Sequence, residues 1–198
     1  MVCGPEYDEQ AIRSSVLASW QGYDFFVLPY FSKRSGKNND VTNFILDFKN
    51  QWPKSVNLVS GLMGDTVAGI EKRLRNDLKC QYIVATPPSS TGTARPASEF
   101  VCKSLADRFR WLKHLPGALQ RTAAVKKSAY AQPGERPGYD DHLKSIRWVG
   151  PDLDLKGRGV ILFDDVYTRG ETSSACRTII KKKTGCAVVV GIFLGRTQ

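Results

Sequence analysis

The sequence lacks any long hydrophobic run. No apolar stretch in its 198 residues approaches the roughly 20 residues that a membrane-spanning helix needs. The N-terminal segment, Met1 to Glu6, has neither the basic flank nor the apolar centre of a secretion signal. With 41% hydrophobic and 24% charged residues, the composition is typical of a soluble globular protein. We therefore expect a cytoplasmic protein that does not enter a membrane.

Metal-binding and disulfide patterns are also missing. The five cysteines are scattered, odd in number and without a Cys-x-x-Cys pair, which indicates neither a disulfide framework nor a zinc knuckle: Cys3, Cys80, Cys102, Cys176 and Cys186. We expect them to be reduced thiols in the core. The two histidines, His114 and His142, have no metal-ligand spacing around them, and we interpret both as structural or surface residues.

Acidic residues are few in comparison with basic ones. The chain has 29 Lys and Arg against 19 Asp and Glu, a formal net charge of +10. Such an excess favours an anionic partner, either a small polyanionic substrate or a nucleic acid, and composition alone does not separate the two. Lys181 to Lys183 account for part of the excess, because cations at a helix C-terminus complement the helix dipole.

The most informative stretch runs from Gly159 to Thr172. Val160 to Phe163 is wholly apolar, as in a strand buried on both faces of a parallel sheet. The run stops at Asp164 and Asp165, which places two carboxylates at the carboxyl end of a central strand. Open α/β sheets bind their ligands at that edge.

Small and hydroxylated residues follow the two acids. Thr168, Gly170, Thr172 and Ser173 lead into a predicted helix over 175–183, and the start of a helix offers N–H groups to an anion. Carboxylates followed by a phosphate cradle imply a ligand with hydroxyls, or a metal, at one end and a phosphate at the other. A ribose 5-phosphate meets that description.

A second strand, loop and helix precede this stretch. Tyr82 to Ala85 predicts a strand, a loop rich in Ser, Thr and Pro follows, and Ser98 is the expected cap of a helix whose apolar face is Val101, Leu105, Phe109 and Leu112. Right-handed crossovers return both strands in the same direction, so the two loops should meet at one edge of a parallel sheet.

The remaining segments complete an α/β chain. We predict an N-terminal appendage over residues 1–22, with a short helix that carries Ile12, Val16 and Trp20, and one domain over residues 23–198. Further strands are expected at 23–30, at 145–149 and at 187–194, with Pro29 at a sheet edge or strand end. Helices are expected from Asp40 through Trp52 and from Met63 to Leu78, and Gly185 is the expected C-cap of the helix after the acids. Between Gln120 and Asp141 the periodicity is lost, which predicts a long mobile connection.

The segment from Gly159 to Thr172 closely resembles the phosphoribosyl pyrophosphate (PRPP) signature of type I phosphoribosyltransferases. Both have four apolar residues, two acids, two mostly apolar residues and a Thr/Gly-rich loop. The order of features is most similar to the ComF/GntX-like subgroup, through Asp47-Phe48-Lys49, Arg95, Arg121-Thr122 and Glu135-Arg136, without that subgroup's N-terminal zinc module. The resemblance implies an open parallel sheet flanked by helices, with a small hood and a flexible loop.

The resemblance also implies residue roles. Asp164 and Asp165 would be the catalytic acids that hold the ribose hydroxyls, partly through Mg²⁺, which they would bind indirectly. Five residues of the loop after the acids would bind the 5-phosphate: Thr168, Arg169, Gly170, Glu171 and Thr172. Four residues of the earlier loop would bind the pyrophosphate: Ser89, Ser90, Thr91 and Arg95. A flexible loop over PRPP would include Arg121, Lys126, Lys127 and Arg136.

The implied reaction is transfer of the phosphoribosyl group from PRPP to an unknown nitrogen nucleophile, with release of pyrophosphate. In 6-oxopurine enzymes of the family the third residue after the acid pair is an Asp that handles the proton on the base, whereas here it is Thr168. A hydroxyl does not accept a proton near neutral pH, which argues against purine salvage.

A different class of function stays open. Members of the superfamily also serve as non-catalytic regulators and as accessory proteins of DNA uptake. Four aromatic residues lie among Lys and Arg in this sequence, an arrangement that would suit single-stranded nucleic acid or a protein partner: Trp111, Tyr130, Tyr139 and Trp148.

Overall fold

The computed structural model describes residues 8–30, 40–125 and 137–197. Its centre is a six-stranded open sheet in which every neighbouring pair is parallel except the first. The order of the strands is β1 (Ser19–Gln21), β2 (Asp24–Tyr30), β8 (Val188–Thr197), β7 (Gly159–Tyr167), β3 (Cys80–Ala85) and β4 (Lys113–His114). The α/β class with an open, mostly parallel sheet is confirmed.

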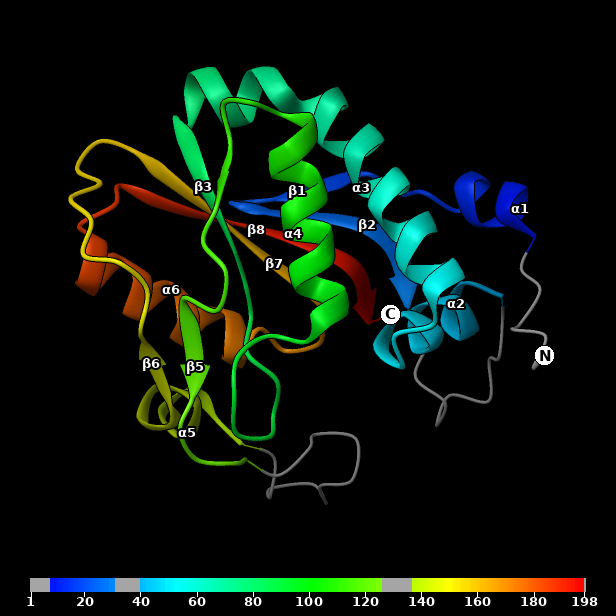
Figure 1. The fold of residues 1–198 in the computed structure, drawn as a ribbon. Coiled ribbons are helices and arrows are strands. Elements are labelled where there is room, and N and C mark those ends of the chain that lie inside the picture. The colour runs from blue at the N-terminus through cyan, green and yellow to red at the C-terminus, as the bar shows by residue number, and fades with distance from the viewer. Residues whose placement is uncertain (1–7, 31–39, 126–136, 198) are drawn as a thin grey trace.

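Helices cover both faces of the sheet (Figure 1). One face carries α2 (Asp40–Lys49), α3 (Pro53–Lys72), its π-helical extension η2 (Arg73–Asp77) and α4 (Pro96–Arg108), and the other carries α6 (Glu171–Thr184). Side chains along β7 alternate between two apolar clusters: Ile161 and Phe163 pack with α2, α3 and α4, whereas Val160 and Leu162 pack with α6. This period of two explains why the strand sequence is apolar throughout.

A small substructure stands beside the carboxyl ends of the strands. Strands β5 (Leu119–Arg121) and β6 (Ile146–Trp148) form a separate antiparallel pair, and α5 (Tyr139–Ser145) precedes β6 and packs against α6. Figure 1 shows these three elements grouped at the lower left of the molecule. The strand expected at 145–149 exists, but it belongs to this small sheet and not to the main one.

The prediction for the N-terminal segment was wrong in its details. Helix α1 (Glu9–Ser14) ends before Trp20, which lies in β1 and pairs with Phe25 of β2. Ile12 is fully buried in the same core cluster as the central strands. Ile12, Val16 and Trp20 of this segment therefore contribute to the apolar core of the main sheet.

Several helix boundaries also differ from the predictions. Helix α2 ends at Lys49, and Trp52 instead forms the cap of α3. Helix α4 begins at Pro96 with Arg95 at the cap position, so Ser98 lies inside the helix and does not cap it. A proline suits the first helical turn, where its missing N–H costs no hydrogen bond.

Other local predictions are confirmed. Gly185 ends α6 with a φ of 65°, and its N–H donates to the Lys181 carbonyl. Four cysteines, Cys80, Cys102, Cys176 and Cys186, are buried free thiols, whereas Cys3 lies outside the described residues. None of the helices in the described ranges is both long and apolar enough to cross a bilayer.

Candidate functional site

The two acids of the signature lie within β7, not after it, because the strand continues to Tyr167. Adjacent residues of a strand point to opposite faces, so the two carboxylates have different surroundings. Asp165 faces α2 and α4, where its Oδ2 lies 3.1 Å from a guanidinium nitrogen of Arg95 and its Oδ1 lies 3.6 Å from Nζ of Lys49. Asp165 is therefore paired with two cations.

Asp164 faces the side of the sheet that α6 covers, and within the described residues it forms no ion pair like those of Asp165. Its Oδ1 accepts a hydrogen bond from the Asp165 N–H at 2.9 Å, and the Thr86 hydroxyl also donates to it. Burial raises the pKa of Asp164 well above its ordinary value, and the neighbouring charge of Asp165 raises it further. The two adjacent carboxyl groups are thus electrostatically unlike.

The predicted phosphate loop connects β7 to α6. Thr168, Arg169 and Gly170 form the connection, and Glu171 and Thr172 lie in the first turn of α6. The first N–H groups of a helix lack acceptors within the helix and point outward from its start. A cavity of about 40 Å³ lies there, and Asp164, His142 and all five predicted phosphate-binding residues line it.

A second cavity of about 180 Å³ lies beside the first. The two share Asp164, Val166, His142 and Thr172 as lining residues. The second cavity holds three cationic side chains, those of Lys49, Arg95 and Arg121, together with Asp165 and the start of the loop after β3. The structure thus brings Asp164, Asp165, the phosphate loop, Ser89 and Arg95 together at one edge of the sheet.

Not all of the predicted pyrophosphate-binding loop reaches this cavity. Ser89 lines it, whereas Ser90 and Thr91 are exposed and do not. The loop is held from the other side, because Gly92 and Arg121 exchange two backbone hydrogen bonds and the Val125 N–H donates to the Ser89 carbonyl at 2.9 Å.

Arg121 is not a flexible-loop residue, and that prediction was wrong. It lies in β5, is 1% exposed, and its guanidinium donates to the Pro88 carbonyl, to Ser145 Oγ at 2.6 Å and to His142 Nδ1 at 3.1 Å. Loss of periodicity after Gln120 suggested a loop, but pairing with β6 makes Arg121 part of a sheet. The other three loop residues, Lys126, Lys127 and Arg136, lie outside the described residues.

The overall fold is similar to that of two solved adenine phosphoribosyltransferases. The enzyme from Leishmania donovani is 12% identical and aligns with a TM-score of 0.45, over 95% of this chain and 79% of that one. The enzyme from Leishmania tarentolae is 11% identical with a TM-score of 0.44, over 90% of this chain and 93% of that one. No protein-family model matches the sequence, and no curated protein matches it either. At these values neither likeness carries an argument about the reaction.

The described residues would bind magnesium only together with a ligand that also coordinates the ion. No three His, Cys, Asp or Glu side chains gather as a metal site within residues 8–30, 40–125 and 137–197. Asp164 and Asp165 face opposite sides, and Asp165 is already paired with Arg95 and Lys49. Mg²⁺ commonly takes one or two carboxylates and completes its shell with water and substrate phosphates. The acid pair would suit such an ion and would not form a protein cage.

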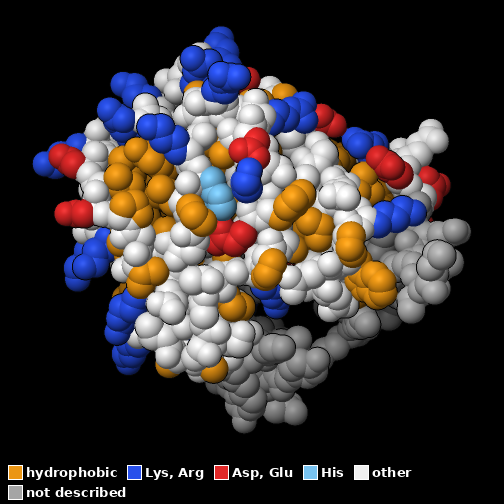
Figure 2. Space-filling model, viewed as in Figure 1, with side chains coloured by type: hydrophobic (Ala, Val, Ile, Leu, Met, Phe, Trp, Pro, Cys, Tyr) orange, Lys and Arg blue, Asp and Glu red, His pale blue; other side chains and the backbone are white. Residues whose placement is uncertain are grey.

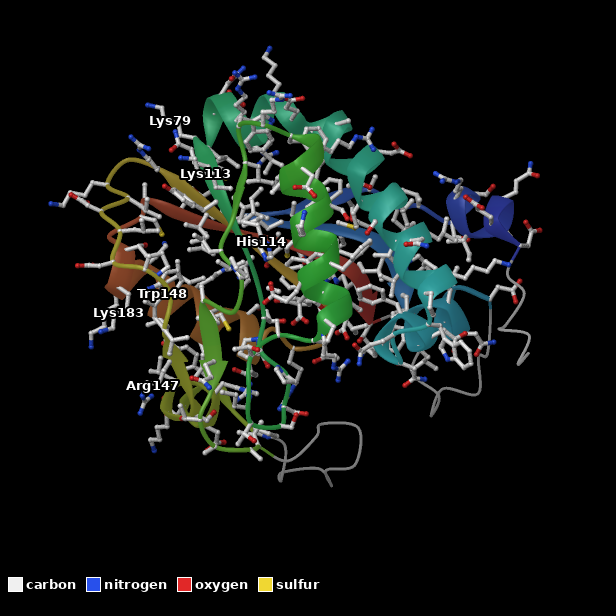
Figure 3. All side chains as sticks on the ribbon, viewed as in Figure 1. Lys79, Lys113, His114, Arg147, Trp148 and Lys183 are labelled. Carbon is white, nitrogen blue, oxygen red and sulfur yellow. The ribbon has the colours of Figure 1, made fainter. Side chains whose placement is uncertain are left out.

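Sequence reasoning missed His142, which it assigned to structure or surface. The side chain is 6% exposed, lines both cavities, and its Nε2 lies 3.3 Å from the Thr172 hydroxyl. Burial and the nearby Arg121 charge lower the pKa of His142 to about 4. No spacing in the sequence marks this residue, because its neighbours come from β5 and α6. His114, by contrast, lies in β4 beside α4 (Figure 3) and contacts Glu99 at 2.6 Å. It lines neither cavity.

The aromatic residues proposed for nucleic-acid stacking do not share a surface. Trp111 packs against the core cluster of α2, α3 and α4, and Trp148 packs against the cluster of α6 on the other face of the sheet. Tyr139 donates a hydrogen bond to Thr178 at 2.9 Å, and Tyr130 lies outside the described residues.

Proposed function

We propose that this protein binds PRPP with Mg²⁺ at the carboxyl end of β7. The observation that carries the proposal is the pair of adjoining cavities that share Asp164 and Thr172. One opens on a helix start with hydroxyl side chains, and the other holds Lys49, Arg95 and Arg121. A ligand with a monophosphate at one end, hydroxyls in the middle and a diphosphate at the other matches this distribution of groups.

The proposed roles of the residues follow from their positions. The first turn of α6, with Thr168 and Thr172, binds the 5-phosphate through N–H and hydroxyl donors. Asp164 and Asp165 accept hydrogen bonds from the ribose hydroxyls. Arg95 and Lys49 border the larger cavity and supply positive charge to the pyrophosphate. Magnesium on the diphosphate would add charge that stabilises the leaving group.

The reaction that we infer is transfer of the phosphoribosyl group to a nitrogen nucleophile, with pyrophosphate as the leaving group. The attack would replace the bond from C1 of the ribose to pyrophosphate oxygen with a bond to nitrogen. Among the phosphoribosyltransferases, the ComF/GntX-like subgroup remains our proposed relation, based on the sequence features given above. The proposal names no acceptor.

Calorimetric titration of PRPP into the purified protein tests the proposal without knowledge of the acceptor. We expect measurable binding with MgCl₂ and weaker binding without it. Asp164→Asn and Asp165→Asn should each weaken binding by at least about tenfold, the equivalent of about 1.4 kcal/mol. Asp154→Asn is the matched control, because Asp154 is an exposed acid that lines neither cavity. The absence of detectable PRPP binding to the wild-type protein would overturn the proposal.

The alternative is a non-catalytic accessory protein that binds single-stranded nucleic acid or a protein partner. The net charge of +10 supports this alternative. The aromatic residues do not, because those in the described part of the chain form no shared stacking surface. Nucleic-acid binding of this kind should fall steeply with added salt and should survive Asp165→Asn. The same variant therefore separates the two functions.

A further inference from the structure

A chain of hydrogen bonds connects the interior of the small substructure to the start of α6. It begins at Arg121, whose buried guanidinium donates to the loop after β3, to Ser145 and to His142. A guanidinium has donors only and does not lose its charge in a protein. The Nδ1 atom of His142 must therefore accept, and it carries no proton while Arg121 donates to it.

The state of His142 follows from that contact. Two influences lower its pKa to about 4, burial and the Arg121 charge, and Asp141 on the same helix only partly opposes them. The ring is consequently neutral at pH 7, and its single proton resides on Nε2. Nε2 faces the Thr172 hydroxyl at 3.3 Å, so the ring donates to that oxygen.

This donation determines what Thr172 can do. A hydroxyl has one proton, and it would spend that proton on His142 if Nε2 were the acceptor. Because Nε2 is instead the donor, the Thr172 proton is available to a third group. Thr172 lines both cavities from the first turn of α6, so an anion at the helix start is the acceptor within its reach.

We propose that Arg121 and His142 are positioning residues that hold the Thr172 hydroxyl as a hydrogen-bond donor to a phosphoryl oxygen at the start of α6. The inference deepens the proposed function and rests on it for the identity of the ligand. It also links segments that are distant in sequence. Arg121 contacts the loop after β3 through the Pro88 carbonyl, and His142 of α5 lies between Arg121 and Thr172 of the proposed phosphate site.

The first test needs no ligand. Long-range ¹H–¹⁵N spectra of the ¹⁵N-labelled protein report which ring nitrogen of His142 carries the proton, and His142→Phe identifies its signals. We expect the Nε2–H form at pH 7 and no protonation down to pH 5. An Nδ1–H form, or titration near the ordinary pKa of about 6.5, would overturn the proposal.

The second test uses ribose 5-phosphate as the probe, because it carries only the monophosphate. We expect Thr172→Val to weaken its binding about tenfold, Thr172→Ser to retain it, and His142→Phe to weaken it about threefold to tenfold. Ser174→Ala is the matched control, since Ser174 is an exposed hydroxyl of the same helical turn that lines neither cavity. It should leave binding unchanged.

The double variant separates positioning from general structure. His142→Phe should have little further effect on binding in the Thr172→Val background, because the hydroxyl that it orients is gone. An equal loss in both backgrounds would overturn the positioning role. If the wild-type protein bound neither PRPP nor ribose 5-phosphate, the proposed function and the phosphate role of Thr172 would both fall. The Nε2–H form would then show that the chain of hydrogen bonds is structural only.

Discussion

Gly170 forms the N-terminal cap of α6 in a left-handed conformation with a φ of 77°, which strongly favours glycine. It is also covered by Tyr167, whose phenol ring and hydroxyl occupy the space where a Cβ would lie. Tyr167 is fixed there by edge contacts with Phe26 and Phe193, at ring-centre distances of 5.1 and 4.8 Å. The large residue at position 167 thus adds a second constraint on the backbone of the proposed phosphate loop.

Gly170→Ala should therefore destabilise the protein by more than the strain of a left-handed alanine backbone alone. We expect a loss of at least about 2 kcal/mol in the free energy of unfolding, from the left-handed backbone and from the clash with Tyr167. Gly157→Ala is the matched control, since Gly157 has a φ of 72° but open space around its Cβ position. It should cost about 1 kcal/mol. Equal losses in denaturant unfolding would contradict a role for Tyr167.

Asp164 makes stability depend on pH in a defined direction. Its pKa is raised in the folded protein, so the folded state binds the proton more readily than the unfolded chain does. The stability that this provides is fully present below the unfolded pKa of about 4 and is lost as the pH rises through the folded pKa. At neutral and higher pH the ionised Asp164 therefore destabilises the fold.

Asp164→Asn should for this reason stabilise the protein while it weakens ligand binding. We expect a gain in unfolding free energy of at least about 1 kcal/mol at pH 8, which shrinks as the pH falls toward 4. Urea unfolding of both proteins at several pH values measures the difference. A constant difference across that range would show that the carboxyl group does not carry the pH dependence.

The positions of the two acids and of the proposed phosphate loop could be predicted from the sequence, whereas those of Arg121 and His142 could not. Asp164 and Thr168 to Thr172 are contiguous, so their relation depends only on a strand, a loop and a helix in succession. The roles of Arg121 and His142 depend instead on how β5 and α5 pack beside α6. No local pattern encodes the contacts of His142 with Arg121 and Thr172, which lie 21 and 30 positions away in the chain.

At the scale of elements, a glycine in β8 allows a contact between helix α6 and strand β2. Gly191 pairs with Asp24 in the parallel register of β2 and β8, and its missing side chain leaves room for Arg177 of α6 to reach Asp24. The Asp24 and Arg177 side chains are 14% and 20% exposed. This ion pair connects α6, the helix that follows β7, to β2, which is two strands away from β7 in the sheet.

Asp24→Ala should leave the Arg177 charge largely buried without its partner. We expect a loss of roughly 3 kcal/mol in the free energy of unfolding. The double variant Asp24→Ala/Arg177→Met should recover part of that loss, because no unpaired charge remains. Chemical denaturation of the single and double variants provides the measurement, and strictly additive losses would contradict a direct coupling.

Element prediction succeeded where one chemical pattern dominated. The apolar strands β3, β7 and β8 and the amphipathic helices α2 and α6 were expected close to their observed positions, whereas α3 begins at Pro53, ten residues before the predicted start at Met63. It failed where a tertiary contact decided the outcome. Trp20 continues a helical spacing from Ile12 and Val16, yet pairing with Phe25 places it in a strand.

Over the molecule as a whole, the positive charge is distributed and not confined to the site. Lys and Arg side chains surround the face shown in Figure 2, and Lys79, Lys113, Arg147 and Lys183 project from separate segments in Figure 3. The proposed site itself is closer to balance, because Lys49 and Arg95 are paired with Asp165. Long-range charge and local recognition should therefore respond differently to salt.

An exposed and distributed charge is screened by salt more strongly than contacts inside a cavity. We expect the affinity for a single-stranded oligonucleotide to fall by more than about tenfold between 50 and 200 mM NaCl, because many released counterions contribute. PRPP affinity, measured by calorimetry at the same two salt concentrations, should fall by less. The oligonucleotide should not displace PRPP at 200 mM NaCl. The contrary result would be tight oligonucleotide binding at 200 mM NaCl together with competition against PRPP. The cavities at β7 would then form part of a nucleic-acid site, and the accessory function would be favoured over phosphoribosyl transfer.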